Sequence, residues 1–302
     1  MDAVTTHTHV EDAADDVEAS KRLPAGSGSI LWLGSRALHM VYELADNVAL
    51  VTASSSGLGK ATAEVFAEAD ANVVVNGRDV ERLEDTVTEL QELGDGEVVG
   101  VAGDLTDADD ISRIVDTTIA EFDGLDHLVT SAGGPPSGRF EELTDEDWYH
   151  AFDLLVMSVV RLVRECAPLL KESDSGTVVT ITSRSVKEAI PSLVLSNAVR
   201  MSVIGLEKTL SKELAPDVRA NAVLPGPHET SRIEGLIEAG VERGEYPSYE
   251  DGLQARGEGN PLGRIGRPRE LGEVVAFLSS ERSSYLNGVA IPVDGGGTAS
   301  NL

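Results

Sequence analysis

The sequence predicts an α/β protein built on a single doubly wound parallel sheet. Short apolar runs, which are typical of buried parallel strands, alternate with longer segments whose apolar residues recur at helical spacing. The first run, residues 48–52, leads into a turn that contains two glycines and then into a helix. With 302 residues, the chain is long enough to bury a large core without disulfides or a structural metal.

The turn after the first predicted strand has the composition of a phosphate-binding loop. Gly57 and Gly59 stand where glycines let the backbone approach a pyrophosphate and let the helix pack close to the strand. The N-terminus of the helix directs N–H groups toward the same phosphates. An ordinary strand-to-helix turn is the alternative. The candidate dinucleotide ligands in this region are Thr52, Ser54, Ser56, Gly57, Leu58 and Gly59.

The end of the second predicted strand, residues 71–75, indicates which dinucleotide is bound. An acidic residue at this place would accept hydrogen bonds from the ribose of NAD, but the chain has Asn76, Gly77 and Arg78 here. A guanidinium group matches a 2′-phosphate with its planar fork of donors. The sequence therefore predicts NADP(H) as the cofactor, with Asn76 and Arg78 as ligands. The alternative is that Arg78 is a solvated residue that opens the next helix.

The remaining elements continue the alternation, in the order of a Rossmann-type fold. We expect strands at residues 97–102, 127–130, 176–182, 218–224 and 288–293, and helices at residues 107–122, 146–171, 193–214 and 268–279. A polar segment, residues 229–260, interrupts this pattern. Ligands of such sheets bind beyond the carboxyl ends of the strands. The candidate cofactor contacts after strand ends are Asp104, Leu105, Ser131, Ala132, Gly133, Pro225 and Gly226.

The composition of the chain restricts its partners and its setting. It has 52 Asp and Glu against 24 Lys and Arg, which gives a formal net charge of −28. A nucleic-acid partner is disfavoured because a phosphate backbone needs a basic face. Halophilic proteins use such acidic self-repulsion, so we expect a protein of a salty cytoplasm; an acidic mesophilic protein is the alternative.

The sequence carries no cysteine framework, membrane span or secretory signal. Cys166 is the only cysteine, so an intrachain disulfide or a cysteine-based metal cluster cannot form, and we expect no metal site. No run of roughly 18 apolar residues occurs, and the N-terminus lacks a basic region followed by a long apolar core. We therefore expect a cytoplasmic protein with no membrane partner.

Residues 1–44 differ from the rest of the chain. Residues 1–29 are polar and acidic without periodicity, and residues 30–33 are a lone apolar patch. We interpret residues 1–44 as a mostly disordered extension and residues 45–302 as one domain. Met40 directly precedes the folded part, so the extension is either a regulatory arm or the result of an upstream start codon.

A series of motifs resembles, in the same order, those of the short-chain dehydrogenase/reductase family over residues 44–297. The resemblance implies a nicotinamide-dependent oxidoreductase that interconverts a small-molecule carbonyl and an alcohol as a homo-oligomer, either a tetramer or a dimer. It also implies that Thr230 holds the nicotinamide carboxamide and that residues 229–260 cap the substrate. Residues 261–268 are similar to those of 3-oxoacyl-carrier-protein reductases and sugar dehydrogenases. The matching motifs are Thr52-(x)4-Gly57-Leu58-Gly59, Asn76-Gly77-Arg78, Asp104-Leu105, Ala132-Gly133, Thr182-Ser183, Pro225-Gly226-(x)3-Thr230 and Asp294-Gly295-Gly296.

The same resemblance reveals departures at the catalytic positions. Members of the family transfer the proton with a Tyr-(x)3-Lys pair, and the matching motifs place Ser196 and Arg200 at these two positions. Leu155 stands at the place of the catalytic asparagine, and Ala53 at that of the first glycine of the phosphate turn. Ser183, at the family's separation of 13 residues before Ser196, keeps the catalytic serine.

These departures require another proton donor. A serine hydroxyl is a far weaker acid than a phenol, and Arg200 does not release its proton, although it can bind the cofactor ribose and supply charge. Ser183 is our candidate for polarising the carbonyl, and Lys187 and His228 are the candidate donors. We expect an NADP(H)-dependent oxidoreductase with an atypical catalytic centre. The alternative is a non-catalytic nucleotide-binding protein that acts as a sensor or an assembly partner.

Overall fold

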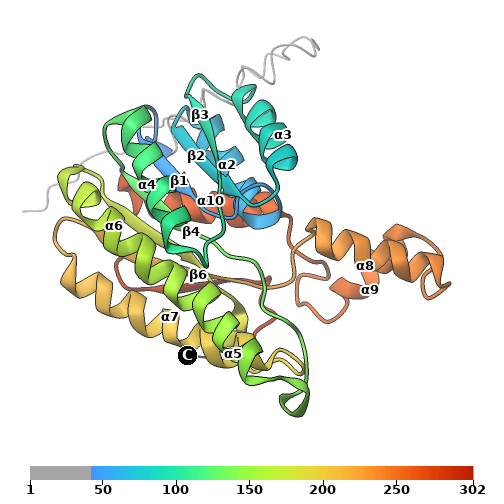
Figure 1. The fold of residues 1–302 in the computed structure, drawn as a ribbon. Helices are drawn as coiled ribbons and strands as arrows, with labels where there is room; N and C mark the ends of the chain where they lie inside the picture. The colour runs from blue at the N-terminus through green and yellow to red at the C-terminus, as the bar shows by residue number, and fades with distance from the viewer. Residues whose placement is uncertain (1–41, 302) are drawn as a thin grey trace, which may run out of the picture.

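The computed structural model describes residues 42–301, apart from the side chains of two residues in one helix, Arg232 and Ala239. Within this range seven strands form one parallel sheet in the order β3-β2-β1-β4-β5-β6-β7 (Figure 1). The predicted Rossmann-type doubly wound fold is confirmed. The strands are β1 (Val48–Val51), β2 (Asn72–Gly77), β3 (Val98–Ala102), β4 (His127–Thr130), β5 (Thr177–Ile181), β6 (Arg219–Pro225) and β7 (Ala290–Val293).

Helices cover both faces of the sheet (Figure 1). Along β1, Ala49 and Val51 pack against the helices of one face, whereas Val48 and Leu50 pack against those of the other. This alternation follows from the two-residue period of a strand, and it leaves β1 buried on both sides. On the first face lie α2 (Gly57–Glu68), α3 (Val80–Gln91) and α10 (Pro268–Ser279), and on the second lie α4 (Ala108–Phe122), α6 (Ser158–Glu172) and α7 (Val194–Glu213).

Aspartate side chains fix where two of these helices begin. Asp79 precedes α3 and accepts a hydrogen bond from the backbone N–H of Arg82 at 3.2 Å. Asp107 precedes α4 and accepts from the N–H of Asp109 at 2.8 Å. Both side chains thus satisfy N–H groups that have no partner inside the helix.

The helix predicted over residues 146–171 is wrong in one respect, because it is interrupted. It consists of α5 (Asp145–Phe152), a π-helical turn η2 (Asp153–Met157) and α6. The turn η2 contains the buried Leu155, at the position where the resemblance expected asparagine. Turns of this kind are frequent at functional sites, and η2 lies beside the cavities described below.

The polar segment of residues 229–260 contains two helices that project from the body of the protein (Figure 1, orange). They are α8 (Ser231–Glu242) and α9 (Tyr249–Gly257). The Ser248 side chain begins α9 by accepting from the N–H of Asp251 at 3.1 Å. Ile237 is fully buried and lies against Gly252, so the two helices share a small core of their own.

The domain begins earlier than the sequence predicted. Tyr42 and Leu44 are buried in the core against α10, and Glu43 pairs with Arg282 at 2.7 Å. Residues 42–44 therefore belong to the domain and not to the predicted extension, whose residues 1–41 lie outside the described range. In the part of the chain that is described, no helix has the length and apolar content needed to cross a membrane. The remaining short helices are η1 (Phe140–Glu142), η3 (Arg184–Val186) and η4 (Glu281–Ser283).

Candidate active site

A cavity of about 620 Å³ lies where β1 to β5 end, with walls formed by the segments that follow these strands. Its volume is typical of sites for small molecules and cofactors. The sequence-predicted residues on its wall are Ser56, Leu58, Gly59, Asn76, Arg78, Asp104, Leu105, Ser131, Ala132, Gly133 and Arg200. Wall residues that the sequence analysis missed include Ser55, Asp79, Arg82, Thr106, Gly134, His150, Leu154 and Thr182.

The turn between β1 and α2 is tightly closed. A Cβ atom on Gly59 would lie 2.4 Å from the carbonyl oxygen of Ala53, so the helix can start here only without a side chain. Ala53 itself has φ +47° and Gly57 has φ +60°. A left-handed conformation costs a residue other than glycine about 1–2 kcal/mol, so Ala53 is strained where the family has glycine.

Thr52 and Ser54, predicted as cofactor ligands, are fully buried beneath this turn. The Thr52 hydroxyl donates to the carbonyl of Ser131 at 2.8 Å and accepts from the N–H of the same residue at 2.9 Å. The Ser54 hydroxyl donates to the carbonyl of Val51 at 2.6 Å. These side chains join the ends of the strands to one another and leave ligand contacts to the residues above them.

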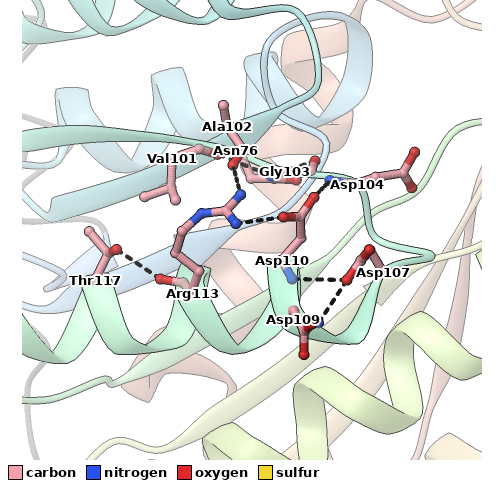
Figure 2. Close-up of polar contacts among 10 residues, drawn as sticks. All are labelled: Asn76, Val101, Ala102, Gly103, Asp104, Asp107, Asp109, Asp110, Arg113 and Thr117. Carbon is pink, nitrogen blue, oxygen red and sulfur yellow. Dashed lines mark hydrogen bonds and ion pairs between the residues drawn. The ribbon is translucent and has the colours of Figure 1, made fainter.

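Asn76 connects the phosphate turn with the end of β3, and Figure 2 shows it beside Val101 and Gly103. Its side-chain amide donates to the carbonyls of Val101 at 3.1 Å and Gly103 at 3.2 Å, and its oxygen accepts from the N–H of Ala53 at 3.2 Å. The side chain is almost wholly buried. Asn76 therefore shapes two walls of the cavity through backbone contacts.

A second network fixes the segment after β3 (Figure 2). Asp110 accepts from the N–H of Asp104 at 2.7 Å and pairs with Arg113 at 2.6 Å. The guanidinium group of Arg113 also donates to the carbonyl of Ala102 at 2.6 Å. The first turn of α4 thus holds Asp104 at the edge of the cavity.

Arg78 and Asp104 face each other across this edge of the cavity. Arg78 Nη1 lies 3.6 Å from a carboxylate oxygen of Asp104, and the Arg78 side chain is 77% exposed. Partial burial raises the pKa of Asp104, but hydrogen bonds from Thr106 and the charge of Arg78 outweigh it, so the pKa lies below its usual value. Arg82, in the first turn of α3, lines the same edge. A second arginine so soon after Arg78 was the signal by which the sequence could have indicated Arg82.

Arg200 lies at the other end of the cavity and is 8% exposed. Its Nη1 donates to the carbonyl of Ile181 at 3.5 Å, whereas its Nε has no hydrogen-bond partner. Burial lowers the pKa of Arg200 to about 10. A buried guanidinium group with an unused donor is costly by itself.

Neither of the two predicted catalytic serines, Ser183 and Ser196, lines the cavity. The Ser196 hydroxyl is buried, 3.0 Å from that of Ser185, and does not contribute to the lining. Ser183 follows Thr182, which does line the cavity, and its hydroxyl accepts from the N–H of Ser185 at 3.1 Å at the start of η3. Ser185, which the sequence analysis did not select, is therefore the residue that contacts both predicted serines.

The two candidate proton donors occupy different surroundings, and neither lines the cavity. His228 is buried against Gly266, and one ring nitrogen lies 3.0 Å from the carbonyl of Gly226. Burial lowers the pKa of His228. Lys187 follows η3 and is partly exposed, beside Glu188, whose carboxylate accepts from the N–H of Ala299 at 3.0 Å. Lys187 is thus the more accessible of the two candidates.

The last strands bring the remaining predicted residues to the phosphate turn. A Cβ atom on Gly57 would lie 3.8 Å from the Thr230 methyl group, so the start of the polar segment of residues 229–260 contacts this turn. A Cβ on Gly226 would lie 2.6 Å from that of Asp294, so Pro225 and Gly226 pack closely against the end of β7. Among the described residues, no group of three or more His, Cys, Asp or Glu side chains could hold a metal ion.

Comparison with known proteins decides the family. The family model described as enoyl-(acyl carrier protein) reductase matches residues 52–298. The 3-oxoacyl-[acyl-carrier-protein] reductase of Thermotoga maritima is 32% identical over 255 residues, which cover 84% of this chain and 98% of the relative. Human dehydrogenase/reductase SDR family member 4 is 33% identical over 262 residues, or 86% of this chain and 90% of the relative. The chain is a short-chain dehydrogenase/reductase.

A solved structure of the same family supports the fold in detail. L-Sorbose reductase from Gluconobacter frateurii, in complex with NADPH and L-sorbose, superimposes with a TM-score of 0.81. The two sequences are 31% identical, and the match covers 85% of this chain and 98% of that one. This short-chain dehydrogenase/reductase therefore shares the whole domain with that relative, including the strand ends that form the cavity.

Proposed function

We propose that the protein is an NADP(H)-dependent oxidoreductase that interconverts a carbonyl and an alcohol with an atypical catalytic centre. The observation that carries the proposal is the cavity, which extends from the exposed Arg78 to the buried Arg200 past the Gly57–Gly59 turn. The lack of a side chain at Gly59 lets the start of α2 pack against Ala53 at the cavity, and the guanidinium group of Arg200 lines the other end. These features fit a nicotinamide dinucleotide.

The preference for NADP(H) rests on the charges at the edge of the cavity. Arg78 is exposed, and its guanidinium group lies beside the Asp104 carboxylate. Arg82 adds a second guanidinium group to the cavity wall. Two guanidinium groups favour a 2′-phosphate. The NADPH named in the L-sorbose reductase complex supports the same preference.

A bound nicotinamide would supply or accept the hydride, and the residues of the chain would orient the substrate and move the proton. Arg200 would bring positive charge to the oxyanion that develops on the substrate. Ser183, which follows the wall residue Thr182, is the candidate that would polarise the substrate carbonyl. Tyr249 of the capping helices is a poor replacement for the missing tyrosine. Burial and a hydrogen bond to Glu229, with Tyr249 Oη 3.0 Å from a carboxylate oxygen, raise the pKa of Tyr249 to about 12.

A titration of the purified protein with NADPH and NADH, followed by a screen of carbonyl substrates, tests the proposal. We expect tighter binding of NADPH and a turnover that Ser183→Ala reduces. Tight NADPH binding without turnover of any substrate would instead support the sensor or assembly role. Binding of neither nucleotide would exclude both.

We further propose that the protein acts as a homo-oligomer in a salt-rich cytoplasm. The net charge of −28 supports the salt-rich setting, because screening relieves the repulsion between its carboxylates. Sedimentation in dilute and molar salt tests the oligomeric state, and a monomer in both would contradict it.

A further inference from the structure

A second, much smaller cavity lies behind Arg200. Its volume is about 10 Å³, close to what one water molecule needs. The residues that line both this cavity and the large one are Ser131, Ala132, Ile181, Thr182 and Arg200. The small cavity therefore adjoins the cofactor cavity, and Arg200 belongs to the walls of both.

A chain of hydrogen bonds leads away from the small cavity into the core. The hydroxyl of Thr130 donates to that of Thr180 at 2.8 Å, and Thr180 in turn donates to a carboxylate oxygen of Glu207. Both threonines line the small cavity. Glu207 lies on α7, two turns after Arg200, and so on the same face of the helix.

Glu207 is unusual for a carboxylate in this acidic protein because it is 3% exposed. Its second carboxylate oxygen has no hydrogen-bond partner. Burial raises the pKa of Glu207 to about 8, against a smaller lowering by the hydrogen bond from Thr180. The carboxyl group is therefore protonated near neutral pH and gives up its proton just above it.

The surroundings of this chain contain few other charges. Of the described residues that line the small cavity, Arg200 is the one with a charged side chain. Strands β4 and β5 and the residues after them contribute Thr130, Ser131, Ala132, Thr180, Ile181 and Thr182, while η2, α6 and α7 contribute Leu155, Ser158, Val159 and Val203. A proton in this region thus has hydroxyl groups to move along, and Arg200 places one positive charge where the path reaches the cofactor cavity.

We propose that Glu207 is the inner end of a buried proton path, which runs through Thr180, Thr130 and one water molecule in the small cavity to the cofactor cavity beside Arg200. The proposal rests on the oxidoreductase function proposed above and supplies the proton that the missing tyrosine would give. Glu207 does not touch the substrate and acts through the other groups of the path. It is therefore a positioning residue that holds the proton at the inner end.

Carbonyl reduction needs one hydride and one proton, and this path supplies the proton. The carbonyl carbon accepts a hydride from the reduced nicotinamide, the π electron pair moves to the oxygen, and that oxygen accepts a proton from the water. When Glu207 is protonated, the two hydroxyl groups rotate so that Glu207 donates to Thr180, Thr180 to Thr130 and Thr130 to the water. Each group then passes its own proton one step outward and receives one from the group behind it. The carbonyl is reduced, the dihydronicotinamide is oxidised, and Glu207 is left as a carboxylate until solvent restores its proton along the same path.

Glu207→Gln tests the path, because glutamine keeps the shape and the acceptor for Thr180 but does not titrate. We expect NADPH to bind as in the wild type, turnover to fall by roughly 10²-fold, and the inflection of the pH profile near 8 to disappear. Unchanged turnover with an unchanged pH profile would overturn the proposal.

An infrared measurement tests the path without turnover. The carboxylic acid band that is lost in Glu207→Gln belongs to Glu207, and we expect it to shift quickly when the protein is transferred to D₂O. Thr180→Val should abolish the fast shift, whereas Thr177→Val should keep it, because Thr177 lies in the same strand but bonds to His127. An equally fast shift in Thr180→Val would overturn the proposal.

The two measurements separate the proton path from the proposed function. A wild-type protein that binds no nicotinamide nucleotide would contradict the proposed function, and the infrared result would still decide the path. A wild-type protein that turns over substrate, with a Glu207→Gln variant of equal activity at every pH, would leave the function and remove the path.

Discussion

The hydroxyl groups of Ser185 and Ser196 lie 3.0 Å apart, and both residues are buried. The sequence resemblance places Ser196 at the position of the catalytic tyrosine of short-chain dehydrogenases/reductases. Its hydroxyl joins α7 to η3, whereas the guanidinium group of Arg200, one turn later, reaches the cavity wall. The Ser196 hydroxyl is thus used within the protein, in a contact between α7 and η3.

Ser196→Ala should therefore act on stability more than on the active site. We expect the free energy of unfolding to fall by about 1 kcal/mol, since a buried hydrogen bond is lost, with the affinity for NADPH unchanged. Urea unfolding and a nucleotide titration measure the two quantities. Full stability combined with a loss of turnover would make Ser196 a catalytic group instead.

Gly59→Ala should abolish nucleotide binding. The new methyl group would lie 2.4 Å from the carbonyl oxygen of Ala53, which is backbone and cannot rotate away, so the turn must open. Gly235→Ala is the matched control, because a Cβ there has nothing within 4 Å. An NADPH titration of both variants decides, and wild-type affinity in Gly59→Ala would mean that the turn is not the phosphate site.

Arg78→Ala should weaken NADPH binding by about 10- to 100-fold and leave NADH binding nearly unchanged. The estimate corresponds to the loss of a charge-assisted hydrogen bond to the 2′-phosphate, roughly 1.5–3 kcal/mol. Arg243→Ala, which removes an exposed guanidinium group paired with Glu245 in the capping helices, serves as the control. Equal losses for NADPH and NADH would show that Arg78 does not read the 2′-phosphate.

His127 should make the protein less stable as the pH falls. The ring is fully buried between Asn47 and Thr177, and burial lowers its pKa to about 4 despite the opposing charge of Asp126. Between about pH 6.5 and 4 the unfolded chain binds a proton that the folded protein does not, so stability falls across this window by at most about 3 kcal/mol.

Urea unfolding at pH 7 and pH 5 measures this dependence. We expect His127→Gln to lose part of the difference between the two pH values, while His150→Gln, at an exposed histidine, keeps it. An identical difference in wild type and His127→Gln would show that the folded protein binds the proton at His127 after all.

Salt should stabilise the protein. The net charge of −28 implies repulsion between surface carboxylates, which counter-ions screen. We expect the midpoint of thermal unfolding to rise steadily when potassium chloride is raised from about 0.1 M to about 2 M. A constant midpoint would favour an ordinary acidic protein over one adapted to salt.

The strands were the most predictable part of the fold. Residues 127–130 were expected as a strand and form β4, because a short apolar run between polar turns has few other ways to bury its side chains. The π-helical turn at Asp153–Met157 could not be predicted, since the apolar spacing continues through it unbroken. The helices α8 and α9 were not predicted, because acidic residues, which are common over the whole chain, made their segment read as an irregular polar one.

The candidate site was predictable where it depends on the backbone and less so where it depends on side-chain direction. The order of motifs placed Gly59, Arg78 and Asp104 at the strand ends, and these residues do line one cavity. Spacing along the chain did not reveal that Ser196 points to Ser185, nor that His228 is packed beneath Gly266. Those outcomes depend on the rotation of α7 and on the close approach of two loops.

Asn76 has a consequence for how the cofactor binds. Its side chain ties Ala53 to Val101 and Gly103, so the protein's own bonds already hold the phosphate turn and the neighbouring wall in place. A dinucleotide therefore meets a preorganised surface and loses little conformational entropy by ordering it. The affinity of this site is then determined by the contacts that the ligand makes, and an Asn76 variant would show its defect first as an entropic penalty in calorimetry.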